Sequence, residues 1–148
     1  MNLTSLDTIF EAELRALVYL FVLGEPDNAE HLGAIDTLAI NAETFHLGAT
    51  DLNGTHRLAS GELDTRTEFM STALRNLALR GLVIYEPASS PSAFSISSAG
   101  ESLVNKFHSD YADTFFTAAQ DVIEQVGQAT TKQLTAIILT KAQPGGTQ

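Results

Sequence analysis

Three titratable residues in one polar stretch are the first candidates for chemistry. His46, Asp51 and His56 lie between two predicted helices and could converge in the manner of a small hydrolase. The histidines, at positions 31, 46, 56 and 108, lack metal-ligand spacing, and the chain has neither a glycine-rich phosphate loop nor a Gly-x-Ser-x-Gly elbow. We therefore expect surface or loop-stabilising histidines, no metal, no cofactor and no catalytic activity.

A second group of candidates surrounds the start of a predicted helix. Arg57 lies just upstream of it, and Glu62 and Arg66 are four residues apart, the spacing at which side chains meet on a helix. Arg66 lies at the edge of the apolar stripe, where burial of an unpaired charge would be costly. The cluster is either an ion pair that fixes the preceding loop to the helix or part of a contact surface with another subunit.

The charge of the chain argues against autonomous nucleic-acid binding. Its 148 residues include 18 Asp and Glu against 8 Lys and Arg, and residues 1–60 carry −7 of the net charge of −10. Affinity for nucleic acids comes largely from Lys and Arg that replace counterions at phosphates. The acidic N-terminal region is therefore expected to face solvent or a basic partner.

Cysteine content and hydropathy restrict the class of protein further. The chain has no Cys, which excludes disulfides and Cys-ligated metal centres. The longest apolar run, residues 16–23, is too short to cross a bilayer, and the N-terminus has acids where a signal peptide needs bases. We expect a cytoplasmic protein that does not contact membranes.

Apolar periodicity predicts a mainly α chain with a small β-hairpin. Helices are expected over residues 7–23, 28–40, 61–80, 110–126 and 131–140, strands over 82–86 and 94–97, and a further helix from the capping box Ser98–Glu101. Gly81 is expected to end the third helix in a left-handed conformation. The order predicts a winged helix-turn-helix core with additional C-terminal helices, as one domain over residues 1–142 with a flexible tail at 143–148.

The third predicted helix is poorly suited to reading DNA. At 100° per residue, the face opposite its apolar stripe contains Glu68, Thr72, Arg75 and Leu79, and the hairpin loop at 86–92 has no Lys or Arg. Direct DNA binding is therefore disfavoured. The alternative that stays open is a winged-helix transcriptional regulator that dimerises through its C-terminal helices.

Several stretches together resemble a known family. They are Leu14–Leu20, Ala34–Leu38, the loop end Arg57–Leu63, Arg66, the segment Leu74–Val83 and Ser109–Ala112. In these stretches the chain resembles the middle component of ABC-type three-component conflict systems, as in Lamassu-type anti-phage defence. Position 67 departs from the resemblance because it is Thr where a second Arg is expected.

The resemblance implies a non-catalytic winged-helix adaptor. Its partners would be an SMC-like ABC ATPase and an effector, commonly a nuclease, and the adaptor would hold the effector inactive until foreign DNA is sensed. DNA would then be contacted only indirectly, through the complex. The candidate interface consists of the charged cluster and the apolar faces of the last two helices. Its residues are Arg57, Glu62, Arg66, Tyr111, Phe116, Ile123, Leu134 and Ile138. For the two apolar faces, packing in the core of the domain is the alternative.

Overall fold

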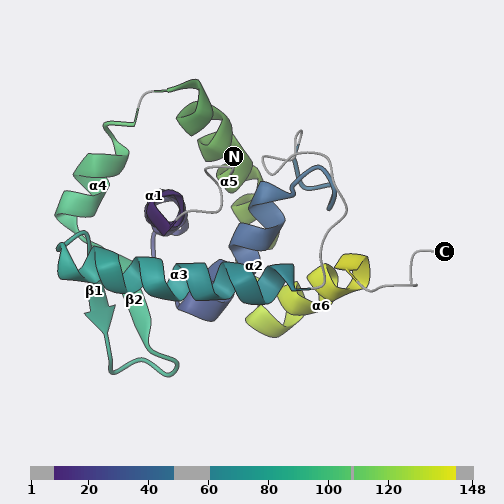
Figure 1. Ribbon diagram of the computed structural model, residues 1–148, viewed down its shortest axis with the longest axis horizontal. Coiled ribbons are helices and arrows are strands. Elements are labelled where there is room, and N and C mark those ends of the chain that lie inside the picture. The colour runs from purple at the N-terminus through teal and green to yellow at the C-terminus, as the bar shows by residue number, and fades with distance from the viewer. Residues whose placement is uncertain (1–8, 49–60, 108, 143–148) are drawn as a thin grey trace.

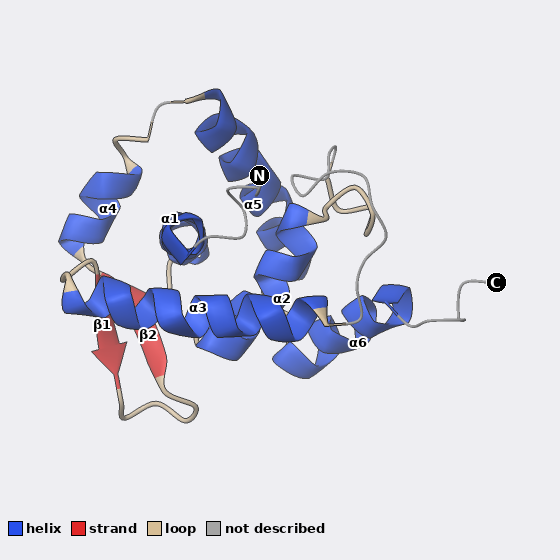
Figure 2. Ribbon diagram, viewed as in Figure 1, coloured by secondary structure: helices blue, strands red, loops and turns tan. Residues whose placement is uncertain are grey.

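The structure, a computed structural model, describes residues 9–48, 61–107 and 109–142. These residues form six helices and a two-stranded antiparallel sheet, so the prediction of a mainly helical chain with a small hairpin is confirmed (Figures 1 and 2). In chain order the elements are α1 (Ile9–Leu23), α2 (Ala29–Ile40), α3 (Glu62–Leu79), β1 (Val83–Glu86), β2 (Ala93–Ile96), α4 (Ser98–Val104), α5 (Asp110–Val126) and α6 (Thr131–Ala142). The predicted tail at 143–148 lies outside the described residues, and the winged helix-turn-helix assignment stays a prediction that this element order favours.

Helices α1 and α2 form the interior. Figure 1 shows α1 end-on, with α3, α4 and α5 around it, and from Ala12 to Leu20 every residue except Leu14 is buried. Such burial is typical of a helix with apolar residues on nearly all sides. Every residue of α2 from His31 to Ile40 is also buried, because α3, α5 and α6 all pack against it.

A buried ion pair joins the two central helices. Arg15 of α1 donates from Nε to Oδ1 of Asp36 at 2.8 Å and from Nη2 to Oδ2 at 3.2 Å. The hydroxyl of Tyr19 also donates to Oδ1 of Asp36. Arg15 and Asp36 are 1% and 0% exposed, so this ion pair lies in the interior of the protein.

The turn after α3 directs the chain into the hairpin. Gly81 adopts φ 77°, and the N–H of Leu82 bonds the carbonyl of Leu77 at 2.9 Å, which confirms the predicted left-handed cap. In the hairpin, Tyr85 pairs with Phe94. Phe94 also exchanges two backbone hydrogen bonds, of 3.0 and 2.8 Å, with Asp27, which precedes α2. This bridge attaches the hairpin to the start of α2 and was not predicted from the sequence.

The cap predicted for the helix after the hairpin is off by one residue. Ser97, rather than Ser98, caps α4, because its Oγ accepts from the N–H of Gly100 at 3.0 Å. Asn28 caps α2, and its side chain accepts from the N–H of His31 at 2.9 Å. In both cases the residue with extended backbone directly before the first helical turn is the cap.

The last helix begins with a reciprocal cap. Thr130 and Gln133 bond reciprocally at the start of α6, with backbone-to-side-chain distances of 2.8 and 3.1 Å. No helix in the described part of the chain is both long and apolar enough to span a membrane.

Candidate partner-binding surfaces

The predicted charged cluster is in part a shielded ion pair on α3. Arg66 Nε lies 3.8 Å from Glu62 Oε2, with side-chain exposures of 4% and 13%, and the Arg66 guanidinium lies 4.8 Å from the centre of the Phe69 ring. The pairing that the i, i+4 spacing predicts is therefore confirmed. Arg57 lies outside the described residues. Because Arg66 is almost fully buried, it offers little surface to another subunit.

The last two helices differ in what they leave exposed. Leu134 and Ile138 of α6 are 0% and 1% exposed and belong to the core, on a helix that packs against α2. The prediction that these two residues form a partner surface is therefore wrong. The apolar face of α6 instead covers α2, which is also covered by α3 and α5. Elsewhere on α6, Ile137 and Leu139 are 38% and 50% exposed.

The candidate residues of α5 are half-buried. Phe116 lies edge-on to Phe21 of α1, with ring centroids 6.0 Å apart, and Ile123 packs against the edge of the core. Both therefore contribute to packing and keep part of their surface exposed. The side chain of Tyr111 lies outside the described residues, as do Asp51 and His56. His46 is exposed, at the end of the turns that follow α2.

A further hollow lies on a different side, between α3, the hairpin and the start of α2. It is a groove of about 700 Å³. We call it the α3–hairpin groove, and it is lined by Asn28, Ala29, Glu30, Ser71, Arg75, Ala78, Leu79, Tyr85, Pro91, Ser92 and Phe94. The position of Leu79 opposite the apolar stripe was the one sequence signal for it. The hairpin wall could not be foreseen because it depends on the bridge to Asp27.

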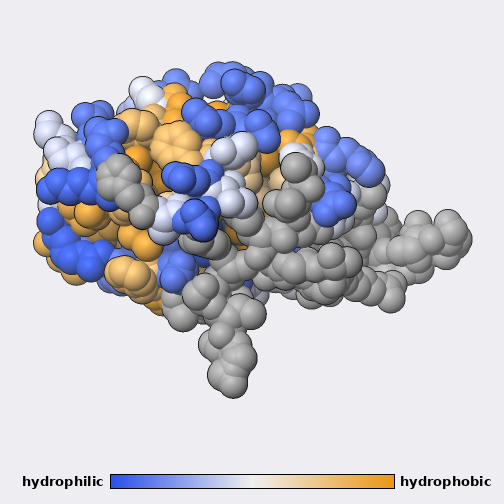
Figure 3. All heavy atoms as spheres, turned by 90° about the horizontal axis from the view of Figure 1, so that it is seen from above, coloured by the Kyte–Doolittle hydropathy of each residue, from blue (hydrophilic) through white to orange (hydrophobic). Residues whose placement is uncertain are grey.

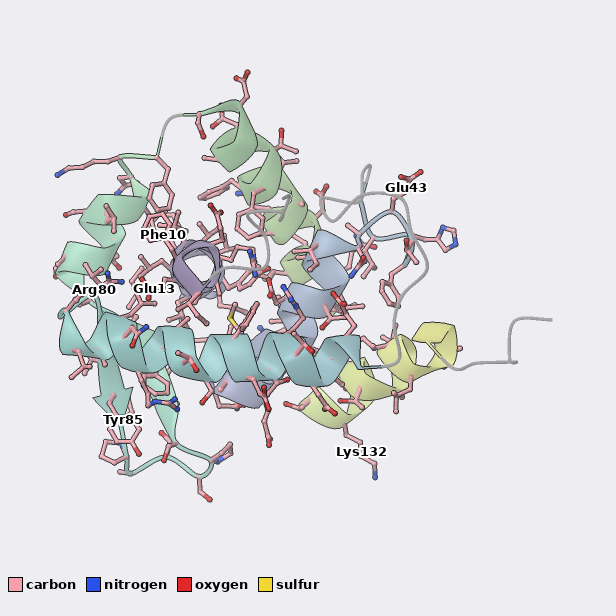
Figure 4. The ribbon with its side chains drawn as sticks, viewed as in Figure 1. Phe10, Glu13, Glu43, Arg80, Tyr85 and Lys132 are labelled. Carbon is pink, nitrogen blue, oxygen red and sulfur yellow. The ribbon has the colours of Figure 1, made fainter. Side chains whose placement is uncertain are left out.

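Large apolar side chains in the α3–hairpin groove are exposed. Leu79 is 86% exposed and Tyr85 is 50% exposed. Figure 4 shows Tyr85 on the hairpin, below the ribbon of α3. Its ring lies 5.2 Å from the ring of Phe94, its cross-strand partner. The groove is therefore an apolar surface with a paired aromatic wall, a type of surface that often binds another protein.

Two charged residues line the same groove. Glu30 lies in the first turn of α2 and Arg75 in the middle of α3, and both are exposed. The guanidinium of Arg75 donates to the hydroxyl oxygens of Ser71 at 2.9 Å and of Thr72 at 3.5 Å, and the second bond is at the limit of a hydrogen bond. The lining thus has one positive and one negative charge.

A histidine fixes the wall of the groove that α2 provides. His31 Nδ1 lies 2.6 Å from Asp27 Oδ2, and its Nε2 lies 2.8 Å from the carbonyl oxygen of Ala129, in the turn before α6. Since both partners accept hydrogen bonds, the doubly protonated ring satisfies both. The hydrogen bond to Asp27 is the main cause that raises the pKa of His31 above 6.5, and burial opposes it.

The end of α3 is attached to α1 by a second polar contact. Glu13 of α1 is 6% exposed and accepts from the guanidinium of Arg80 and from Nδ2 of Asn76, the latter at 3.0 Å. Figure 4 shows Glu13 and Arg80 near the C-terminal end of α3. This contact keeps α3 in place directly beside the exposed Leu79.

A smaller hollow of about 300 Å³ lies between α1 and the start of α5. Its lining includes the charged residues Glu11 and Lys106 and the aromatic residues Phe107 and Phe115. Figure 3, which views the molecule from above, shows hydrophobic residues among hydrophilic ones on that face of the protein. In the described part of the chain, no three His, Asp or Glu side chains are grouped so that they could hold a metal ion.

Comparison with known proteins gave one informative result. The protein-family model described as "ABC-three component (ABC-3C) system Middle Component 2" matches residues 5–147. A search of curated proteins and a search of solved structures found no match. The family match covers all of the helices and both strands described above.

Proposed function

Because the chain belongs to the Middle Component 2 family of ABC-three-component systems, we propose that it is a non-catalytic adaptor subunit of a Lamassu-type defence complex. It bridges an SMC-like ATPase to an effector and controls the effector. Membership of the family implies partnership with the other components of a multi-component system. The two partners and the controlling role are the parts that we propose beyond this membership.

The observation that carries this proposal is the apolar α3–hairpin groove. In a winged-helix protein that reads DNA, this side would contact the duplex and need several Lys or Arg residues for the phosphates. Here the lining has Arg75 and Glu30 as its charged residues, and the hairpin loop at 87–92 has no Lys or Arg. The exposed Leu79 and Tyr85 would gain by being covered with apolar protein surface.

The adaptor role is tested with the purified chain and with its co-expressed neighbours. Alone, the chain is expected neither to hydrolyse ATP nor to retard DNA at moderate salt. Co-expressed with the ATPase and the effector encoded beside it, the chain is expected to co-purify with both in a defined stoichiometry. A homodimer that binds its own promoter DNA, with an affinity that falls steeply with salt, would instead identify the chain as a transcriptional regulator.

A further inference from the structure

We propose that the α3–hairpin groove binds an apolar segment of a partner component that carries a carboxylate for Arg75. The proposal rests on the adaptor function above and identifies the side of the molecule on which one partner binds. The apolar anchors of that segment lie between Leu79 and the Tyr85–Phe94 pair. Its carboxylate lies at the end of the groove where Ser71 and Thr72 hold the arginine.

Burial of the groove residues supplies the affinity. Leu79 is 86% exposed, although it is the last residue of a helix that packs against α1 and α2. A volume of about 700 Å³ accommodates several side chains, and the rings of Tyr85 and Phe94 form a firm wall because backbone hydrogen bonds hold their strands. Aromatic side chains of this kind often dominate the energy of protein interfaces.

The negative charge proposed for the partner segment follows from a comparison of Arg75 with the other arginines of the chain. In the described residues, Arg15, Arg66 and Arg80 each form an ion pair with a carboxylate of the chain. Arg75, in contrast, is held by neutral hydroxyl groups, although the chain as a whole has a net charge of −10. A partner carboxylate supplies the missing counter-charge. Because such a pair is exposed at the rim, it contributes more to orientation and specificity than to affinity.

Two other occupants fit less well. A nucleic acid would gain little from the groove, because its many phosphates need several Lys or Arg residues and Arg75 is the one that the lining provides. A second copy of the chain could pair Arg75 with the Glu30 of its partner, but it would bring together two chains that each have a net charge of −10. A partner component with an apolar, carboxylate-bearing segment meets neither difficulty.

The test measures binding of the full chain to the purified ATPase component and to the purified effector component, each in turn, with single substitutions. We expect Leu79→Ser to weaken binding of one component by about tenfold to a hundredfold, since a buried leucine side chain is removed from the contact. Tyr85→Ser is a second variant with the same expectation. Arg75→Glu should weaken binding by about two- to tenfold, and because it replaces an attraction by a repulsion, added salt should narrow the difference from the unsubstituted chain.

The matched control is Leu139→Ser, which removes an exposed leucine from α6 on another side of the molecule. It should leave both affinities unchanged. Because Leu79, Tyr85 and Leu139 are all at least half exposed, the variants should fold, and the unfolding transition of each free chain checks this. Arg75→Lys keeps the positive charge and should retain most of the binding affinity that Arg75→Glu loses.

Each of the following outcomes would overturn the docking proposal and would also show whether the adaptor function still holds. If Leu139→Ser weakens binding and the groove variants do not, the adaptor function stands and the docking site is on α6. If Leu79→Ser abolishes a homodimer of the free chain, the groove binds a second copy. If Arg75→Glu abolishes binding of a double-stranded DNA probe, it binds nucleic acid. If the unsubstituted chain binds neither component, the adaptor function itself fails.

Discussion

Replacing Asp36 with alanine removes the carboxylate that joins α1 to α2 through Arg15 and Tyr19. Asp36 is fully buried and accepts two hydrogen bonds from Arg15, at 2.8 and 3.2 Å, and another from Tyr19. The guanidinium of Arg15 is 1% exposed, so water cannot replace the lost partner without opening the core. The variant therefore keeps a buried cation whose principal counter-charge is missing.

The expected cost is large in relation to the stability of a domain. Breaking a buried ion pair by removing one partner costs about 3–5 kcal/mol, whereas a domain has only about 5–15 kcal/mol in total. Replacing both partners, as in Arg15→Met with Asp36→Leu, removes the charge along with its counter-charge. This double variant should regain most of the stability, because similar replacements of buried pairs are often neutral.

Urea unfolding followed by circular dichroism measures the effect, and the change in midpoint multiplied by the slope gives the free energy. Lys132→Ala is the control, because Lys132 is exposed on α6, and it should change the free energy of unfolding by less than about 0.5 kcal/mol. A loss below about 1 kcal/mol for Asp36→Ala would refute the reasoning. So would a double variant that is less stable than Asp36→Ala alone.

Three further substitutions test the contacts that position α2, α3 and α6. His31→Gln should lower the free energy of unfolding most below pH 6.5. The loss should shrink as the pH rises through the raised pKa of the wild-type histidine, because the unsubstituted protein then also loses the charged hydrogen bond to Asp27; urea unfolding across this pH range measures the difference. Gly33→Ala places a Cβ 2.7 Å from Thr67 Cα and should cost about 1–3 kcal/mol in the same assay. Thr130→Ala removes a cap and should lower the stability by about 1 kcal/mol.

Local features of the sequence were predictable because they depend on residues close together in the chain. The glycine cap at Gly81, the pairing of Glu62 with Arg66 and the reciprocal cap at Thr130 each need only a few neighbouring residues. The family was also recognisable from the sequence, because patterning over nearly the whole chain supports it.

Contacts between distant segments were not predictable, because periodicity shows which residues are apolar but not what covers them. Leu134 and Ile138 lie on an apolar stripe that fits a partner surface and a core equally well, and packing against α2 decides for the core. Likewise, nothing local indicates that Asp27 bridges to Phe94 and thereby forms one side of the groove.

The departure at position 67 has a physical explanation. The backbone of α3 at Thr67 comes so close to Gly33 of α2 that even a Cβ on Gly33 would lie 2.7 Å from Thr67 Cα. Position 67 therefore faces α2, where a longer arginine side chain would have to leave the crossing of the two helices. The ion pair that the structure shows at this end of α3 is that of Glu62 with Arg66.

The central claim is that the chain connects an ATPase to an effector. The most direct test is to purify those two components with and without the chain and to measure their association by analytical ultracentrifugation. An adaptor predicts that the ATPase and the effector sediment together only when the chain is present, and that the effector is less active in the complex than alone. Equal association of the two components in the absence of the chain would contradict the account.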